Sequence, residues 1–453
     1  MYKEFLDVVD EKKDVIFGAC DYIFDNPELC FLEEKAVKYL KKVLKENGFV
    51  IDDNLVGIPT AFKASYGVGK PSIGVLAEFD AVAGMSQVGG EETQKSIDGM
   101  DASHSCGHNL FAGGSLGAVL AIKSYIEKTG KGKITLFGCP AEEGGGGKVF
   151  MARDGAFEGI DAVVSWHPES MYMVRTRPAL ANIKVNYHFK GVSAHAGADP
   201  HKGRSALDAV ELMNIGANFL REHMEQSCRV HYAILDAGGT APNMVQSHAT
   251  VSYMMRASDC ESVQELKERV DRIAKGATLM TDTTVESEVV SAYANLITIP
   301  TLQMTANEAM QSIPVPIPTD EELAYGKALQ STMKLTAEQK ALPPFATFVK
   351  EPAPPVPHGG STDTADVSWV VPTVQMHIAN WVLGTPGHSW QSASQSRGSF
   401  AKKATLYASK AVASTVIRLF EDTEKIEKAK KEHFEKTSGK YISLLPKELK
   451  YKA

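Results

Sequence analysis

Apolar residues recur along the first 170 residues in two alternating patterns, one typical of helices and one typical of buried strands. Helical periodicity covers residues 5–48 and ends on Gly48. Short apolar runs and helical segments then follow one another. The predicted strands are 72–78, 133–138 and 161–166, and the predicted helices between them are 111–128 and 147–154. This alternation predicts an α/β fold with a mostly parallel, helix-flanked sheet.

The order of elements changes near Ala181. Strands are expected at 182–190, 229–236, 248–257 and 283–292, and helices at 204–224 and 262–279. The order strand-helix-strand-strand-helix-strand is the signature of a ferredoxin-like α+β unit. We therefore expect residues 183–296 to form a separate, inserted domain.

Patterns like those of the first region return after this insert. Helices interrupted by prolines are expected over 300–357, a buried strand at 370–378 and a long helix at 398–420. The lysine-rich tail from Glu424 has the pattern of a solvated helix rather than a binding arm. One domain therefore consists of residues 1–182 and 297–453, on either side of the insert.

Charge and cysteine usage exclude several classes of protein. No apolar stretch is long enough to span a membrane, and the N-terminus lacks the pattern of a secretory signal. The net charge of −7 argues against nucleic acid or an anionic membrane as a partner. The six cysteines have no paired short spacings, which fits a reducing cytoplasm. Most should be small buried side chains, but Cys106 has polar and histidine-rich neighbours.

Chemically capable side chains gather where the predicted strands end, or in loops that contain glycine and proline. The carboxyl ends of parallel strands meet at one edge of a sheet, so these side chains should converge. The candidates are Asp80 after strand 72–78, the segment 105–109 (SCGHN), Glu142 and Glu143 after strand 133–138, His167 after strand 161–166, and His388 in a loop.

This set fits a centre that holds two divalent ions. A thiolate, a carboxylate and three imidazoles are donors that zinc, manganese or cobalt accepts. Glu142 is left over for acid–base work on the water, and Asp80 is placed to orient a histidine ligand. The five donors are Cys106, His108, Glu143, His167 and His388.

The same residues also allow other interpretations. A lone histidine is more often a satisfied polar side chain than a ligand, and a pair of glutamates usually lies on a solvated face. The glycines at 144–147 lack the Gly-Lys-Ser/Thr spacing of a phosphate-binding loop. A cysteine-nucleophile amidase would use Cys106 with a histidine base, and it would keep its activity without metal. The joint occurrence at successive strand ends favours the metal centre.

Four motifs together resemble a known family. The chain resembles the aminoacylase and carboxypeptidase G family of dimetal peptidases, in the subfamily with a cysteine ligand, over essentially its whole length. Segments 203–214 and 360–373 narrow the resemblance to one hydrolase of that subfamily. The four motifs are 105–109 (SCGHN), 140–145 (PAEEGG), 166–168 (WHP) and 384–391 (GTPGHSWQ).

The resemblance implies roles for the candidate residues. Glu142 would be the general base, and the five donors would bind two ions, manganese or zinc. The insert would be a lid and dimerisation domain, and the remainder the catalytic domain. His195 would polarise the scissile carbonyl, within one chain or across a dimer, while Asn243 and Arg256 would hold the substrate's carboxylate.

Three residues depart from the family's pattern or add to it. Asn109 stands where many relatives have aspartate. Glu78 stands where many have a histidine, which removes a possible sixth ligand. His104 is an alternative donor.

The expected protein is a cytoplasmic, metal-dependent amidohydrolase that cleaves N-acyl amino acids bearing a free carboxylate. The favoured substrate is p-aminobenzoyl-glutamate or a related aroyl or acyl amino acid. A dipeptidase or a general N-acyl-amino-acid hydrolase is the alternative enzyme. A homodimer or a heterodimer with a homologous subunit is expected. The chain could then be a non-catalytic partner, although its complete set of donors and Glu142 argue against an inert subunit.

Overall fold

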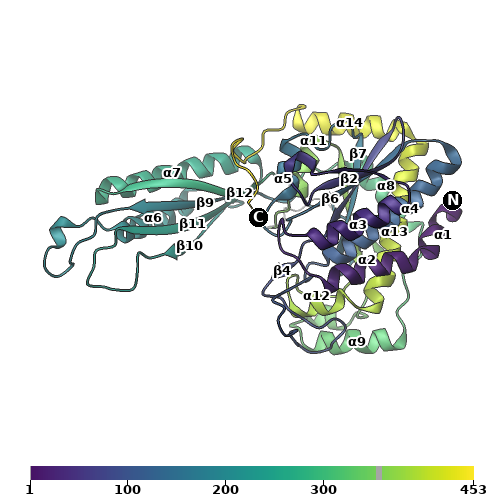
Figure 1. The fold of residues 1–453 in the computed structure, drawn as a ribbon, viewed down its shortest axis with the longest axis horizontal. Coiled ribbons are helices and arrows are strands. Elements are labelled where there is room, and N and C mark those ends of the chain that lie inside the picture. Colours follow the sequence, from purple (N-terminus) through teal and green to yellow (C-terminus); the bar gives the residue numbers. More distant parts are fainter. Residues whose placement is uncertain (1, 353–359, 453) are drawn as a thin grey trace.

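The computed structural model describes residues 2–352 and 360–452, and its helices and strands form two regions (Figure 1). The large region comprises the described residues up to 180 and from 294 onward, and it is built on an eight-stranded sheet. The small region, residues 181–293, is built on a four-stranded sheet and projects from one side of the large region (Figure 1).

The large sheet has a parallel centre and mostly antiparallel margins. Strands β6, β3, β7 and β14 are parallel to one another, whereas β2 runs antiparallel to β6 and β8 antiparallel to β14. The order across the sheet is β1 (Val50–Asp53), β2 (Phe62–Gly67), β6 (Lys133–Cys139), β3 (Ser72–Glu78), β7 (Ala162–Glu169), β14 (Thr373–Ala379), β8 (Tyr172–Val174) and β13 (Val349–Lys350). The predicted fold class is confirmed.

Helices cover this sheet, and α4 lies at the centre of the packing. Its glycines allow close approach, because a Cβ on Gly114 would lie 2.4 Å from the Trp166 ring and one on Gly113 would lie 2.3 Å from Cys20 Sγ. The helices are α1 (Lys3–Glu11), α2 (Lys13–Asp25), α3 (Glu34–Glu46), α4 (His108–Thr129), α5 (Gly147–Arg153), α8 (Pro300–Gln311), α9 (Asp320–Ser331), α10 (Ala337–Lys340), α11 (Thr364–Val370), α12 (Trp390–Gln395), α13 (Ser399–Glu421) and α14 (Thr423–Thr437).

The small region has the predicted order of elements. Its antiparallel strands lie in the order β10-β11-β9-β12, and α6 and α7 pack against β9 and β11. This is the strand order of a ferredoxin-like unit. The elements are β9 (Ala181–Lys190), α6 (Ala206–Leu220), β10 (Arg229–Asp236), β11 (His248–Ala257), α7 (Cys260–Thr281) and β12 (Thr284–Tyr293).

Several predicted boundaries in the large region were wrong. The segment 5–48 is broken into three helices, and α4 begins at His108 rather than near residue 111. Strand β7 continues through His167 to Glu169, because β14 pairs with it over that length. Residues 370–372 precede β14 and are not part of it.

Two further segments differ from expectation or cannot be compared. Helix α14 is not solvated on every side, since it buries Ile426 and Ala429. The proline-rich run expected up to residue 357 lies in part outside the described residues. Among the helices of 2–352 and 360–452, none has the length and apolar character to cross a membrane.

Candidate metal centre

The candidate donors converge at the carboxyl end of the parallel strands. Asp80 lies just after β3, Glu142 and Glu143 lie in the loop after β6, and His167 lies near the end of β7. Cys106 and His108 come from the start of α4, and His388 comes from the loop after β14. The structure therefore brings together five residues that are distant in sequence, as expected for the edge of a parallel sheet. The five are Cys106, His108, Glu143, His167 and His388.

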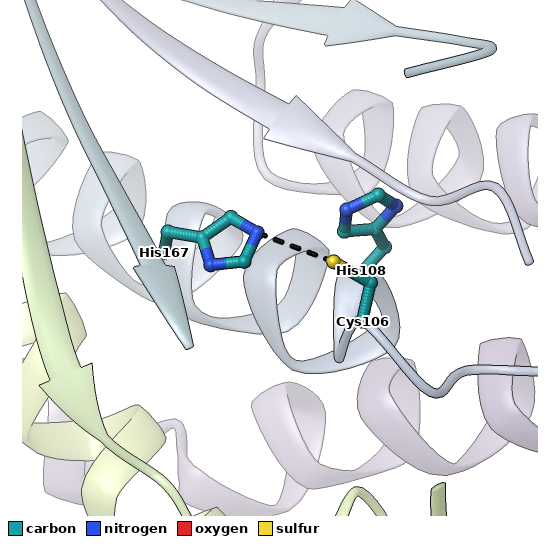
Figure 2. A group of neighbouring side chains, drawn as sticks. All are labelled: Cys106, His108 and His167. Atoms are coloured by element: carbon teal, nitrogen blue, oxygen red, sulfur yellow. Dashed lines mark hydrogen bonds between the residues drawn. The ribbon is translucent and has the colours of Figure 1, made fainter. Parts of the chain in front are cut away.

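These five side chains form two groups that share one sulfur atom. Cys106, His108 and His167 form the first group, with donor atoms within 4.8 Å of one another, and Cys106 Sγ lies 3.5 Å from His167 Nε2 (Figure 2). Cys106, Glu143 and His388 form the second group, in which Glu143 Oε1 lies 3.2 Å from His388 Nε2. Each group could hold a cation, and Cys106 would contribute to both.

Asp80 positions two of the candidate donors, His108 and Glu143. Its Oδ1 lies 2.9 Å from His108 Nδ1, which turns Nε2 of that ring toward the other donors. Its Oδ2 accepts a 2.8 Å hydrogen bond from the backbone N–H of Glu143. One carboxylate thus fixes a histidine and the loop that carries a candidate ligand, as carboxylates behind metal-binding histidines do.

The cluster contains buried polar atoms that lack hydrogen bonds. Among the described residues, His108 Nε2, Glu143 Oε1 and Glu78 Oε2 make no hydrogen bond of good geometry, although His108 Nε2 lies 3.1 Å from Glu78 Oε2 and Glu143 Oε1 lies 3.2 Å from His388 Nε2. Leaving such atoms unsatisfied costs about 1–3 kcal/mol each. Bound cations would satisfy all three, so the residues present fit a metal centre.

Two residues at this site, Ala141 and His388, have strained backbone conformations. Ala141, directly before the two glutamates, has a φ of 59°, and His388 has a φ of 53°. Residues other than glycine adopt this left-handed conformation at a cost of about 1–3 kcal/mol, and they cluster at functional sites. The loops are therefore held in conformations that aim Glu142 and His388 at the cluster.

The two adjacent glutamates have opposite electrostatic environments. Burial raises the pKa of Glu142 well above its usual range, and the charges of Glu78 and Asp363 raise that pKa further. For Glu143, burial acts to raise the pKa, but the hydrogen bond from His388 and the charge of His108 outweigh it and bring the pKa to about 2. Thr362 donates a 3.0 Å hydrogen bond to Glu142 Oε1. Glu143 is thus set up as an anion, and Glu142 as a proton carrier.

A buried lysine beside the cluster was not found from the sequence. Lys148 Nζ lies 2.7 Å from Glu78 Oε1 and 2.6 Å from Asp363 Oδ1, and all three side chains are almost fully buried. Glu78 Oε2 in turn lies 3.1 Å from His108 Nε2. A single lysine at the start of the apolar segment Gly147–Arg153 was the only signal in the sequence.

The structure changes the interpretation of Glu78 and His104. Glu78 was expected to remove a possible ligand position, yet its carboxylate forms a third donor group with His108 and Glu142. His104 lies outside the candidate groups, and its Nε2 lies 3.0 Å from the carbonyl oxygen of Ile23. Asn109 has a packing role, since its amide donates to the carbonyls of Cys20 and Ser396.

A cavity of about 700 Å³ opens next to the cluster, and Arg256 lines it. The Arg256 guanidinium donates a 2.9 Å hydrogen bond to Ser361 Oγ. Cys106, both glutamates, His167 and His388 line the same cavity. The structure therefore brings Arg256 to the candidate centre.

His195 and Asn243 are not brought there. Both are exposed and neighbour each other, because Ala196 N–H donates to the Asn243 carbonyl. They lie beyond the end of β9 at Lys190, whereas the Ala181 end of that strand adjoins the large region. Ten strand residues span roughly 30 Å at about 3.3 Å each. These two residues therefore lie far from the donors of their own chain.

Comparison with known proteins identifies the family. Residues 178–279 match the M20 peptidase dimerisation domain. A p-aminobenzoyl-glutamate hydrolase subunit from Escherichia coli (strain K12) is 38% identical over 470 aligned positions, covering 99% of this chain and 98% of the relative. The Xaa-Arg dipeptidase of Mus musculus is 28% identical, covering 94% of this chain and 90% of the relative.

A solved structure with the same fold belongs to the same family as these relatives. A dinuclear metal-binding peptidase of the M20 family from Bacillus subtilis has a TM-score of 0.58 at 18% identity, covering 89% of this chain and 98% of that chain. The resemblance found in the motifs, including its narrower match to one hydrolase, is confirmed by the relative at 38% identity. The chain belongs to the M20 family of metallopeptidases and amidohydrolases, enzymes that hydrolyse amide bonds.

Proposed function

We propose that this enzyme hydrolyses the amide bond of N-acyl amino acids that carry a free carboxylate. The favoured substrate is p-aminobenzoyl-glutamate or a related aroyl or acyl amino acid, which the relative at 38% identity supports by its name. The observation that carries the proposal is the pair of donor groups sharing Cys106 Sγ, with Glu142 beside them. We propose two divalent ions there, manganese or zinc, held by the five donors.

Glu142 carries the proton through the reaction. The two ions, when bound, polarise the amide carbonyl and acidify the attacking water. Glu142 takes a proton from that water and delivers it to the leaving amine nitrogen. Glu143, held as an anion, serves as a ligand instead.

Arg256 holds the carboxylate of the amino acid. Its guanidinium lines the cavity that contains Glu142 and the donors, and a guanidinium binds a carboxylate through paired hydrogen bonds. Ser361 accepts one of its hydrogen bonds and keeps the head group in place. This arrangement supports a preference for substrates with a free carboxylate over their amides or esters.

His195 and Asn243 act, in this proposal, on the cavity of a second chain. The length of β9 keeps them far from the donors of their own chain. The edge strand β10 exposes Tyr232, Ile234 and Leu235, with 37–57% of each residue accessible, as a surface that a partner would cover. We propose that residues 183–296 are the lid and dimerisation domain, in a homodimer or in a heterodimer with a homologous subunit.

Two other enzymatic functions have specific support. A dipeptidase is favoured by the relative at 28% identity. A cysteine-nucleophile amidase is favoured by the 3.5 Å separation of Cys106 Sγ and His167 Nε2, which is also a nucleophile–base spacing. A non-catalytic subunit is disfavoured because all five donors and Glu142 converge. The free thiols of all six cysteines support a reducing, cytoplasmic location.

One experiment separates these functions. Protein purified without chelator is assayed on N-acyl amino acids and dipeptides, with the metal content measured on the same sample. We expect about two ions per chain, loss of activity on chelation and recovery with manganese or zinc. Activity that survives complete metal removal would indicate the cysteine nucleophile. Absence of metal, with no gain on adding manganese, zinc or cobalt, would contradict the proposal.

A further inference from the structure

The cavity beside the cluster is lined by more cationic than acidic side chains, the acidic ones being Glu142, Glu143 and Glu169. Arg175, Arg177, Lys184, Arg256 and Lys350 all line it. Within the part of the chain that the structure describes, Arg175 forms no ion pair with an acidic side chain, and its interactions are hydrogen bonds to uncharged oxygens. A charged group placed in this way, inside a cavity, is a site for an anionic ligand.

Arg175 is held in a defined position. It follows strand β8, and its backbone N–H donates a 2.9 Å hydrogen bond to the Gln375 carbonyl. Its Nη1 donates a 2.8 Å hydrogen bond to Gln375 Oε1, and Gln303 donates to its carbonyl oxygen. Nη2 finds no partner among the described residues, so both of its protons are available to a ligand. The guanidinium is therefore fixed on one side and open on the other.

Arg175 is partly buried, and none of the described acidic side chains forms an ion pair with its guanidinium. Desolvation lowers the pKa of Arg175, while the charges of Glu142 and Glu169 act in the opposite direction. The side chain nevertheless remains a cation, because guanidinium does not lose its proton in proteins. A carboxylate bound at Nη2 would restore the hydrogen bonds and the charge balance lost on burial.

Arg175 and Arg256 both line the cavity, and Ser361 links Arg256 to the segment that begins at Arg175. Ser361, which accepts a hydrogen bond from Arg256, donates a 2.8 Å hydrogen bond to the carbonyl of Leu180. Leu180 belongs to the segment that begins at Arg175 and leads into β9. Arg175 belongs to this segment, and Arg256 is linked to it through Ser361. The α-carboxylate of a substrate would bind one of the two guanidinium groups and leave the other available.

We propose that Arg175, positioned by Gln375, binds a second carboxylate of the substrate, on the side chain of the amino acid, and so selects N-acyl aspartates and glutamates. This inference rests on the proposed function. Arg256 takes the α-carboxylate, and Arg175 takes the side-chain carboxylate of the same residue. Substrates with a lysine or arginine side chain bring a further cation to this wall and are disfavoured.

The test compares an acid with its own amide. The value of kcat/KM is measured on p-aminobenzoyl-glutamate and p-aminobenzoyl-glutamine for the wild type, Arg175→Met and Arg175→Lys. We expect the wild type to prefer the glutamate. Arg175→Met should lower kcat/KM on the glutamate ~10–100-fold, the range for a lost charge-assisted pair, and should change the glutamine value less than about 3-fold. Arg175→Lys should keep part of the preference.

Arg272→Met is the matched control, since this arginine lies on α7, its side chain is exposed and it is not among the residues that line the cavity. It should keep the preference for glutamate. Melting temperature and metal content, measured for every variant, identify any that has lost its fold. N-succinyl-glycine against N-butanoyl-glycine tests whether the carboxylate instead belongs to the acyl half. A preference there that Arg175→Met abolishes overturns the assignment to the amino acid side chain.

Failure of this inference is distinguishable from failure of the proposed function. Wild-type protein that hydrolyses the glutamate and glutamine conjugates equally well overturns only the inference. An equal loss on both substrates in Arg175→Met, with fold and metal retained, also overturns it. Wild-type protein that hydrolyses no N-acyl amino acid contradicts the proposed function, and with it the inference.

Discussion

The large and small regions contribute to the candidate site in opposite ways. In the large region the five donors and Glu142 come from strand ends and loops that one packed sheet holds together. In the small region His195 and Asn243 are exposed, and they lie beyond the far end of a ten-residue strand. The first set is assembled by the fold of one chain. His195 and Asn243 reach a substrate only if the small region moves or a second chain associates.

This difference shows which parts of the mechanism depend on one chain and which depend on an assembly. In the proposed mechanism, metal binding and proton transfer use only side chains of the large region. In the same proposal, His195 stabilises the reacting carbonyl, which would need the small region of another chain or a large rearrangement. Single substitutions in each region test that division, beginning with the largest expected effect.

Substitutions of Glu142 and Glu143 test the roles assigned to the large region alone. Glu142→Gln should keep the metal and lose ~10²–10⁴-fold in turnover, because the proton carrier is gone. Glu143→Ala should lose metal occupancy, since it removes a donor from the second group. Metal content by elemental analysis and kcat are measured on the same samples. Equal metal loss in both variants would refute the assigned roles.

Substitution of Lys148 tests how much its buried ion pairs with Glu78 and Asp363 contribute to folding stability. Lys148→Met leaves Glu78 and Asp363 buried without their cation, a change that typically costs about 3–5 kcal/mol of folding free energy. Urea unfolding can be followed by tryptophan fluorescence, because all four tryptophans lie in the large region.

Lys41→Met is the control for this measurement. Lys41 pairs with Asp53 at 2.8 Å, but both side chains are substantially exposed, so a loss of about 0–1 kcal/mol is expected. A similar small loss for Lys148→Met would show that the buried triad contributes little to stability.

His195 tests the small region. His195→Ala should lower kcat ~10²–10³-fold on every substrate, the range for a lost oxyanion donor, with unchanged metal content. If the residue acts across a homodimer, mixing this variant with Glu142→Gln should recover about a quarter of wild-type activity after subunit exchange, since half the dimers are mixed and each has one intact site. A heterodimer would give no recovery. Near-wild-type activity of His195→Ala alone would remove the small region from the mechanism.

Substitution of Arg256 tests the boundary between the two regions. Arg256 lies on β11 of the small region and lines the cavity that also contains the candidate donors of the large region. Arg256→Met should lower kcat/KM on a free carboxylate by ~10-fold or more and have little effect on the matching amide. The ratio of the two substrates is the measurement. A ratio that stays at its wild-type value would assign the carboxylate to another residue.

Much of the fold and of the donor set could be predicted because the signals are local. The central strands are continuous apolar runs, and each candidate donor follows one of them or starts the next helix. The order of elements in the small region was predicted for the same reason. The end of β7 was misplaced because its length is set by pairing with β14, a partner far along the chain.

The residues that were missed depend on contacts between distant segments. Lys148 and Asp363 were missed, and the ion-pair role of Glu78 was not foreseen, because these residues come from α5, the loop before α11 and β3, and only the folded chain joins them. Arg175 has an ordinary sequence context, and its meaning comes from Gln375 on β14 and from the cavity. A lone charged residue in a sequence says little until the neighbours that do or do not neutralise it are known.

The two chain segments that connect the regions also form part of the substrate cavity. Asn182 at the start of β9 pairs with Tyr293 at the end of β12, and both residues line the cavity. If the small region rotates on these two connections, the pivot lies in residues that also line the cavity. With a lever of roughly 30 Å, a rotation of about 10° at this pivot displaces the far end of the sheet by about 5 Å. A substrate bound against Asn182 and Tyr293 would then contact that pivot itself.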